Sequence, residues 1–300
     1  MQITPQSLCD LRVAINQQFQ GARAKTPSVY QQFASRTTAA TKTVSFPSHA
    51  ATRKLRRWDG ERKVVNGKAY DYRVTAEKFE LTMGIPVEEI EDDNIGAYNH
   101  LVMDMGEQTA LWPDDLAFEG LLAGETELAF DGLPFFSNSH ALKSGSAIDN
   151  LHASTALTKD NVAAIIELMM GYVGEDGRSL RVKPNLLVVP PALQEEGLAI
   201  VFGSNTAAAG ITNTMQGRLQ LAVYPELGAS AGGSDSTWYL MDTTRSVKPL
   251  VFVERSAPEM TFKNAASDDN VFWDDEVVFG VRARGAIGYG PFWLASKCIA

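Results

Sequence analysis

The sequence contains few of the residues on which metal centres, disulfide frameworks and many catalytic motifs depend. It has two cysteines and four histidines in 300 residues. Cys9 and Cys298 lie near opposite ends of the chain and match no metal or redox spacing, which favours two reduced thiols. The histidines show no His-x-x-x-His pairing and are His49, His100, His140 and His152. We therefore expect neither a metal site nor a disulfide.

Long apolar runs are also missing. No stretch approaches the roughly 18–20 apolar residues that a membrane-spanning helix needs. The N-terminus does not show the basic and then apolar pattern of a secretion signal, so export is not expected. Hydrophobic residues make up 45% of the chain and charged residues 21%, as in ordinary folded proteins. The length allows one large domain or two modest ones.

Positive charge is scarce except at the N-terminal end. Residues 1–68 hold twelve of the 27 basic residues and three of the 36 acidic ones, which gives them a net charge of +9. The rest of the chain therefore carries −18. A basic segment on an acidic body is suited to contacts between copies of the chain or to a polyanion, or it is simply a solvated surface. The charge division alone leaves these alternatives open.

The first fifty residues predict a short helix and then an extended arm. Thr4 followed by Pro5 is typical of a helix start, and an apolar stripe runs from there to about Gly21. Residues 22–52 are rich in Ala, Thr, Ser and Gln and show little periodicity. They offer too little apolar surface to offset the entropy cost of ordering, so we expect an arm without a core of its own. The stripe consists of Leu8, Leu11, Ile15 and Phe19.

A basic cluster and a hairpin signal follow the arm. Residues 53–57, which we call the basic cluster, contain Arg53, Lys54, Arg56 and Arg57 and precede Trp58. No array of stacking aromatics accompanies them, which disfavours direct nucleic-acid recognition. Asn66-Gly67 then separates two strand-like segments, the strongest short-range signal for a β-hairpin. A projecting hairpin is stable only when it packs against a neighbour.

Residues 79–124 predict a long structural beam. Residues 79–83 alternate as a half-buried strand, and five acids lie between Glu88 and Asp93. We expect Asp92 and Asp93 to cap the following helix, and Pro113 to end or kink it, with a second helical piece beyond. Its predicted buried face contains Ile95, Tyr98, Val102 and Met105.

The remainder predicts a helix–strand–helix layer and a strand-rich end. Thr158 is expected to cap a helix, and residues 185–189 form an apolar run typical of a strand buried on both faces. A helix is expected over residues 192–202 and a loop over 203–217. Further strands are predicted at 219–224, 237–241, 250–254, 259–263, 277–285 and 292–295.

No candidate reaction site has the spacing that its chemistry requires. Ser137, Ser139 and His140 lack the Gly-x-Ser-x-Gly elbow of a hydrolase. The acidic runs at 88–93 and 268–276 lack the glycine and alternate spacing of a calcium loop, and capping with salt bridges is favoured for them. Residues 228–234 are glycine-rich but lack the Gly-Lys-Ser/Thr ending of a phosphate loop. We expect no catalytic, cofactor-binding or metal-binding residues.

Five ordered stretches resemble one family over nearly the whole chain. The first runs from Thr4-Pro5 to Gly21, and the second is the strand from Phe79 to Ile85. The others are residues 91–98, residues 183–190, and an aromatic- and glycine-rich series between Val271 and Trp293. With these stretches the chain resembles the Mu-like phage major head subunits, which have the HK97-type coat fold.

The resemblance implies an α+β fold and a structural role. Residues 1–52 would be the N-terminal arm, 53–83 the extended loop, and 84–154 the peripheral domain with a spine helix at 92–123. Residues 155–245 would be the axial domain, and 246–300 would return mainly to the peripheral domain. The protein would be the major capsid protein of a bacteriophage. It would self-assemble into hexamers and pentamers of an icosahedral head around double-stranded DNA, with the arm and loop embracing neighbouring subunits.

Partners and alternatives follow from the same resemblance. No long charged coiled segment precedes the arm, so a separate scaffolding protein is expected, together with a portal, a decoration protein and non-specific charge contacts to the packaged DNA. The virion, assembled in the bacterial host cytoplasm, is the expected location. Two alternatives stay open: a cytosolic hydrolase using Ser139 or Ser137 with His140, and an encapsulin-like cellular shell of the same fold.

Overall fold

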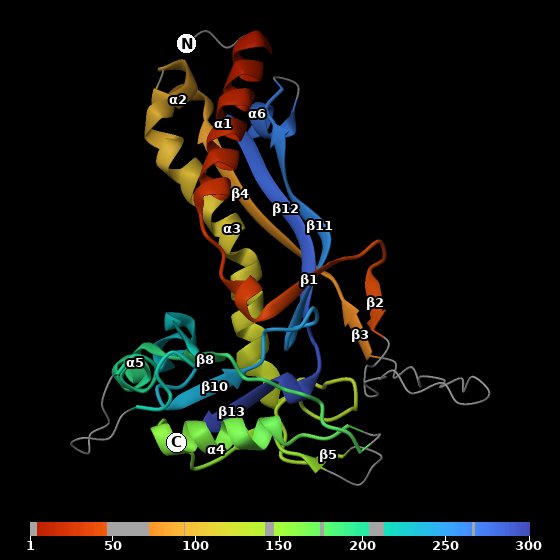
Figure 1. Cartoon of the computed structure of the whole chain (residues 1–300). Coiled ribbons are helices and arrows are strands. Elements are labelled where there is room, and N and C mark those ends of the chain that lie inside the picture. Colours follow the sequence, from red (N-terminus) through yellow and green to blue (C-terminus); the bar gives the residue numbers. More distant parts are fainter. Residues whose placement is uncertain are drawn as a thin grey trace.

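The protein divides into an elongated part and a layered part (Figure 1). The structure, a computed structural model, describes residues 5–46, 72–92, 94–141, 147–174, 177–203, 213–265 and 268–300. Two long helices lie beside long curved strands in the elongated part, and a second sheet with shorter helices lies at one end. Helix α3 runs from the far end of the elongated part down to the layered part and so connects the two.

The elongated part is a four-stranded sheet with helices α1 and α3 against one face. The strand order is β1-β11-β12-β4, and β1 is parallel to β11 while the other pairs are antiparallel. All four members of the predicted α1 stripe are buried. The elements are α1 (Pro5–Lys25), β1 (Ala34–Thr38), β4 (Glu77–Pro86), α3 (Asn99–Leu122), β11 (Leu250–Lys263) and β12 (Glu276–Tyr289).

The layered part is a five-stranded sheet of order β7-β13-β10-β8-β9. Every residue of β8 and β10 is buried, as expected for strands covered on both faces. The amide of Asn161 donates to the Thr158 hydroxyl at 3.2 Å, which confirms the predicted helix cap. The elements are β7 (Leu151–His152), α4 (Lys159–Met170), β8 (Leu186–Val189), α5 (Gln194–Val201), β9 (Gln220–Val223), β10 (Thr237–Met241) and β13 (Ala295–Ile299).

Smaller elements decorate both parts. An antiparallel ladder of β2 and β3 packs Val74 against Val251 and Val253 of β11, outside the main sheet. Among the described residues, the remaining elements are β2 (Thr43–Phe46), β3 (Tyr72–Thr75), α2 (Val87–Glu91), β5 (His140–Ala141), β6 (Ala147–Ile148), α6 (Asp269–Trp273) and short 3₁₀ turns.

The long helix begins later than predicted. Helix α3 starts at Asn99, and its N-cap residue Tyr98 makes no side-chain capping bond. Asp92 instead ends the short helix α2, where its amide donates to the Glu88 carbonyl at 2.9 Å. A 3₁₀ segment, Asn94–Tyr98, separates the two helices. The predicted capping role of Asp92 was therefore wrong, and Asp93 lies outside the described residues.

Pro113 does not end the long helix. Helix α3 is continuous from Asn99 to Leu122, although proline removes one backbone hydrogen bond and costs about 3 kcal/mol in a helix interior. The preceding residue, Trp112, packs on Phe79 and Phe252 with ring centroids 5.2 and 5.4 Å apart. Burial of the helix on both sides of the proline thus outweighs the local penalty, and the expected second helical piece is the same helix.

The arm contributes more to the core than its sequence predicts. Helix α1 continues past Gly21 to Lys25, and Tyr30 and Phe33 then enter the largest hydrophobic core. Strand β1 adds to the edge of the long sheet. Part of residues 22–46 therefore belongs to the folded body of the subunit and does not form an arm without a core. The basic cluster and the Asn66-Gly67 hairpin signal lie outside the described residues.

The C-terminal strands are longer than predicted. The segments 250–254 and 259–263 form a single strand, β11, whose pairing with β12 shifts between Glu254 and Ser256 and again between Ser256 and Glu259. The predicted strand at 292–295 is a 3₁₀ turn, Phe292–Leu294, followed by β13.

Candidate assembly interface

A buried carboxylate attaches the arm to the long helix. Asp114 of α3 accepts hydrogen bonds from the Ser28 hydroxyl at 2.7 Å, the Val29 amide at 3.0 Å and the Tyr30 amide at 2.7 Å. Only 4% of Asp114 is exposed. Sequence analysis expected a second helical piece beyond Pro113 and did not identify this contact, because Asp114 lies inside the continuous helix α3.

Helices α1 and α3 approach most closely at a glycine. A Cβ added to Gly106 would lie 2.6 Å from the Phe19 carbonyl oxygen and 2.9 Å from the Ala22 Cβ. The two backbones therefore touch where a larger residue would separate them. Around this crossing, the α1 stripe, Val102, Met105 and residues of β12 form a second hydrophobic cluster, separate from the main core.

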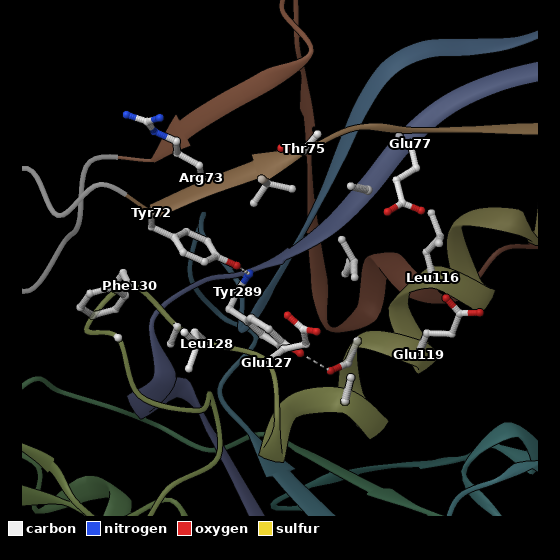
Figure 2. Close-up of a pocket in the computed structure, with 18 of the residues that line it drawn as sticks. Tyr72, Arg73, Thr75, Glu77, Leu116, Glu119, Glu127, Leu128, Phe130 and Tyr289 are labelled. Atoms are coloured by element: carbon white, nitrogen blue, oxygen red, sulfur yellow. Dashed lines mark hydrogen bonds between the residues drawn. The ribbon is translucent and has the colours of Figure 1, made fainter.

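A hollow lies between the β2–β3 ladder and the long helix. It has a volume of about 890 Å³ and is lined by β3, the start of β4, the C-terminal half of α3, residues 127–132 and the end of β12. Figure 2 shows Tyr72 and Tyr289 on one wall with Glu119 of α3 across from them. The Tyr289 amide donates to the Tyr72 hydroxyl at 2.8 Å, and the Tyr289 hydroxyl donates to the Gly120 carbonyl at 2.8 Å. These bonds fix the wall to α3.

The charged residues that line this hollow are mostly acidic. Among the described residues, the acidic lining residues are Glu77, Glu119, Glu127 and Asp131, and the basic one is Arg73. The Arg73 side chain points away from the hollow in Figure 2. Burial raises the pKa of both Tyr72 and Tyr289, and the nearby Glu127 carboxylate raises it further.

The residues of the hydrolase alternative are arranged as structural groups. His140 is fully buried, its Nδ1 lies 2.6 Å from Asp131 Oδ2, and its Nε2 lies 3.2 Å from the Phe135 carbonyl oxygen. Its ring stacks on Phe292 at a centroid distance of 3.8 Å. The Ser137 and Ser139 hydroxyls lie 3.5 Å from each other. Both histidine nitrogens are engaged by groups other than these serines, so the nucleophile–base hydrogen bond is missing from this geometry.

The other predicted residues are dispersed. His100 is exposed, His152 Nδ1 lies 3.7 Å from an Asp149 carboxylate oxygen, and His49 lies outside the described residues. Cys9 is exposed and Cys298 is buried, and both are free thiols. Within the described ranges, no three His, Cys, Asp or Glu residues gather as a metal site, and no helix is long and apolar enough to cross a membrane.

The comparisons with known proteins place the whole chain in one family. The family model for the Mu-like prophage major head subunit gpT matches residues 8–155, 149–227 and 228–298. The chain belongs to this family. The head subunit is 27% identical to the major capsid protein of Escherichia phage Mu over all of its own length and 75% of that protein. It is 24% identical to the FluMu major head subunit of Haemophilus influenzae, over 99% of this chain and 74% of that one.

Solved structures agree with the family. The head subunit is 28% identical to a chain of the bacteriophage JBD30 procapsid, with a TM-score of 0.63, and the match covers 99% of this chain and 76% of that one. A virus-like particle from Pyrococcus furiosus matches with a TM-score of 0.53 over 95% of this chain and 97% of that one. At 11% identity this second likeness shows the fold alone.

The predicted family, fold class and function are thereby confirmed. The head subunit is a phage major capsid protein with the α+β, HK97-type coat fold. Neither alternative is favoured: the hydrolase lacks its hydrogen-bonded pair, and the full-length family match is to phage head subunits and not to a cellular shell. Relatives in solved capsids show that chains of this kind assemble with copies of themselves.

Proposed function

We propose that copies of this capsid protein form hexamers and pentamers that build an icosahedral head around double-stranded DNA. The observation that carries the proposal is the match of the whole chain to the major head subunit family, together with the likeness to a procapsid chain. The asymmetry of the subunit supports it, because the elongated part has a thin core and long edges that neighbours would cover. Its location is then the virion, after assembly in the host cytoplasm.

The domain boundaries inferred from the family are part of this proposal. They are an arm at 1–52, an extended loop at 53–83, a peripheral domain at 84–154, an axial domain at 155–245 and a return at 246–300. The observed division into two parts supports them, since α3, β11 and β12 lie in the elongated part and α4, β8, α5 and β10 in the layered part. Strand β13, however, joins the layered sheet, so the return is divided between the two parts.

We assign the subunit no catalytic, cofactor-binding or metal-binding residues. Its proposed partners are other copies of itself, a separate scaffolding protein, a portal and a decoration protein, with non-specific charge contacts to DNA. The relative's structure is a procapsid, which supports assembly in stages.

Electron microscopy with sedimentation of the purified protein tests the proposal. Shells, tubes or rings of five or six subunits are the expected result, either from the protein alone or from cells that also make the other head proteins of its phage. A protein that stays monomeric under both conditions would overturn it.

A further inference from the structure

We propose that one end of the five-stranded sheet, which we call the basic sheet end, contacts the phosphate backbone of double-stranded DNA. It consists of Arg181, Lys183, Arg218 and Arg245. The proposal rests on the proposed function, which places DNA inside the head, and it names the surface of the subunit that meets this DNA. That surface belongs to the layered part and not to the basic N-terminal segment.

Three segments that are far apart in the sequence bring these cations to the same end of the sheet. Strands β8 and β9 are parallel and begin side by side, so Lys183 and Arg218, which shortly precede them, lie at one end. Strand β10 is antiparallel to β8 and ends where β8 begins, which brings Arg245 to this end as well. In Figure 1 the arrow of β10 points toward α3. Because neighbouring strands lie only about 4.7–4.9 Å apart, cations from these segments can meet one phosphate backbone.

Hydrogen bonds hold two of the arginines next to each other. The Arg245 guanidinium donates to the carbonyl oxygens of Leu180 at 2.6 Å and Arg181 at 2.9 Å. Arg181 has a left-handed backbone conformation with a φ of 54°, which is uncommon for a residue with a side chain. Its amide donates to the Ser179 hydroxyl at 3.0 Å. Strained backbone of this kind recurs at binding sites, and an anion bound between two adjacent cations relieves their repulsion.

The positive charge of the basic sheet end is not neutralised within the subunit. Arg181, Lys183 and Arg218 are exposed, and none of them forms a salt bridge with another described residue. The carboxylate of Asp242 lies 3.8 Å from Arg245, but it is fully buried and also accepts a hydrogen bond from the Lys183 amide at 2.8 Å. Since the chain beyond residue 68 carries −18, a contact with DNA requires a surface on which cations predominate.

The neighbouring side chains suit a phosphate backbone better than an acidic protein. Thr244 and Gln220 are exposed in the same segments, and hydroxyl and amide groups join Arg and Lys in most contacts to DNA phosphates. Protein interfaces are usually anchored by large aromatic residues at their centre. None of the large exposed hydrophobic residues in the described part of the chain lies in residues 178–185, 216–220 or 242–248. The chemistry of this surface therefore favours nucleic acid.

Binding of duplex DNA to the unassembled subunit tests the proposal, measured by fluorescence anisotropy over a range of salt concentrations. Lys183→Gln with Arg218→Gln removes two phosphate contacts. The expected result is an affinity about tenfold below that of the wild type at low salt, and a slope of log K against log salt that is shallower by about 1.8, since each contact contributes about 0.9. Lys183→Arg with Arg218→Lys keeps both charges and should keep the wild-type slope.

A matched control separates this surface from net charge. Lys78→Gln with Arg282→Gln makes the same change in charge at exposed positions of the elongated part, and should leave affinity and slope nearly unchanged. Equal losses in the two glutamine variants would show that only net charge matters, and would overturn the proposal. Wild-type binding by the Lys183→Gln, Arg218→Gln variant, or no DNA binding by the wild type, would overturn it too.

Assembly of the same proteins distinguishes the remaining outcomes. If the Lys183→Gln, Arg218→Gln variant binds DNA normally but does not assemble, the basic sheet end contacts a protein and the proposal is wrong. Failure of the wild-type protein to assemble would instead count against the proposed function. The binding assay uses the unassembled subunit, so the two failures are distinguishable.

Discussion

The layered and elongated parts of this subunit differ in how completely each one buries its own strands and pairs its own polar groups. In the layered part, every residue of β8 and β10 is buried, and side-chain bonds complete the helix cap and the turns. In the elongated part, Ile85 is the only buried residue of the ten-residue strand β4, which pairs on one side only within the described residues. The first part is built like an ordinary domain core, and the second has surfaces that assembly would complete.

The largest expected effect lies in the layered part. Trp238→Ala removes a fully buried ring of β10 and should lower the free energy of unfolding by about 3–5 kcal/mol. Chemical denaturation of the unassembled subunit measures it. Trp273→Ala is the control, because 77% of Trp273 is exposed, and its loss should cost far less. Equal losses in the two variants would contradict the view that the layered part holds the main core.

The contact of the arm with α3 should give the next largest effect. Asp114→Ala leaves the Ser28 hydroxyl and the Val29 and Tyr30 amides without their acceptor, and should cost about 2–4 kcal/mol in unfolding free energy. Asp104→Ala on the same helix is the matched control, since Asp104 is exposed and accepts a hydrogen bond from the Gln108 side chain at 3.4 Å. If both variants unfold alike, Asp114 does not hold the arm.

Two glycines test how closely α1 and α3 must approach. Gly106→Ala forces a Cβ against the Phe19 carbonyl and should destabilise the subunit by about 1–3 kcal/mol. Gly21 lies inside α1, and a Cβ added to it would meet no atom within 4 Å apart from its chain neighbours and the backbone of its own helix. Gly21→Ala should therefore stabilise the subunit by about 0.5–1 kcal/mol. Thermal unfolding distinguishes the two changes by their opposite signs, and a stabilising Gly106→Ala would refute the close crossing.

The smallest expected effect is a dependence of stability on pH in the layered part. Burial lowers the pKa of His152 below its ordinary value of 6.5, partly offset by Asp149. Between the folded pKa and 6.5 the unfolded chain binds the proton and the folded chain does not, so stability falls as the pH drops through this range. His152→Gln should flatten this part of the curve, as measured by unfolding at several pH values. An unchanged slope would contradict the assignment to His152.

Features that depend on residues close together in the sequence were predictable. The α1 stripe, the Thr158 cap and the buried run before Pro190 each depend on residues a few positions apart, and the structure confirms all three. Their physics is local: helical periodicity, a hydroxyl near a free amide, and an unbroken apolar run.

Features that depend on distant residues were missed. Strand β1 pairs in parallel with β11, more than 200 residues away, and no pattern within residues 34–38 indicates that partner. Pro113 is tolerated inside α3 because the neighbouring Trp112 ring packs against Phe79 and Phe252, which belong to two separate strands. The acidic hollow collects carboxylates from β4, α3 and residues 127–131, so its charge becomes visible only once the chain has folded.

The register shifts in β11 bear on the shape of the subunit and, through it, on the proposed head. They lie between Glu254 and Glu259, where β11 passes from the main core to the second hydrophobic cluster. An irregularity of this kind bends a strand and increases its twist, so it fixes the direction in which the elongated part departs, and β11 and β12 curve together in Figure 1. In a closed shell a small tilt in each subunit is repeated in every copy. If copies of the subunit form the proposed shell, a few residues in this strand would therefore contribute to its curvature.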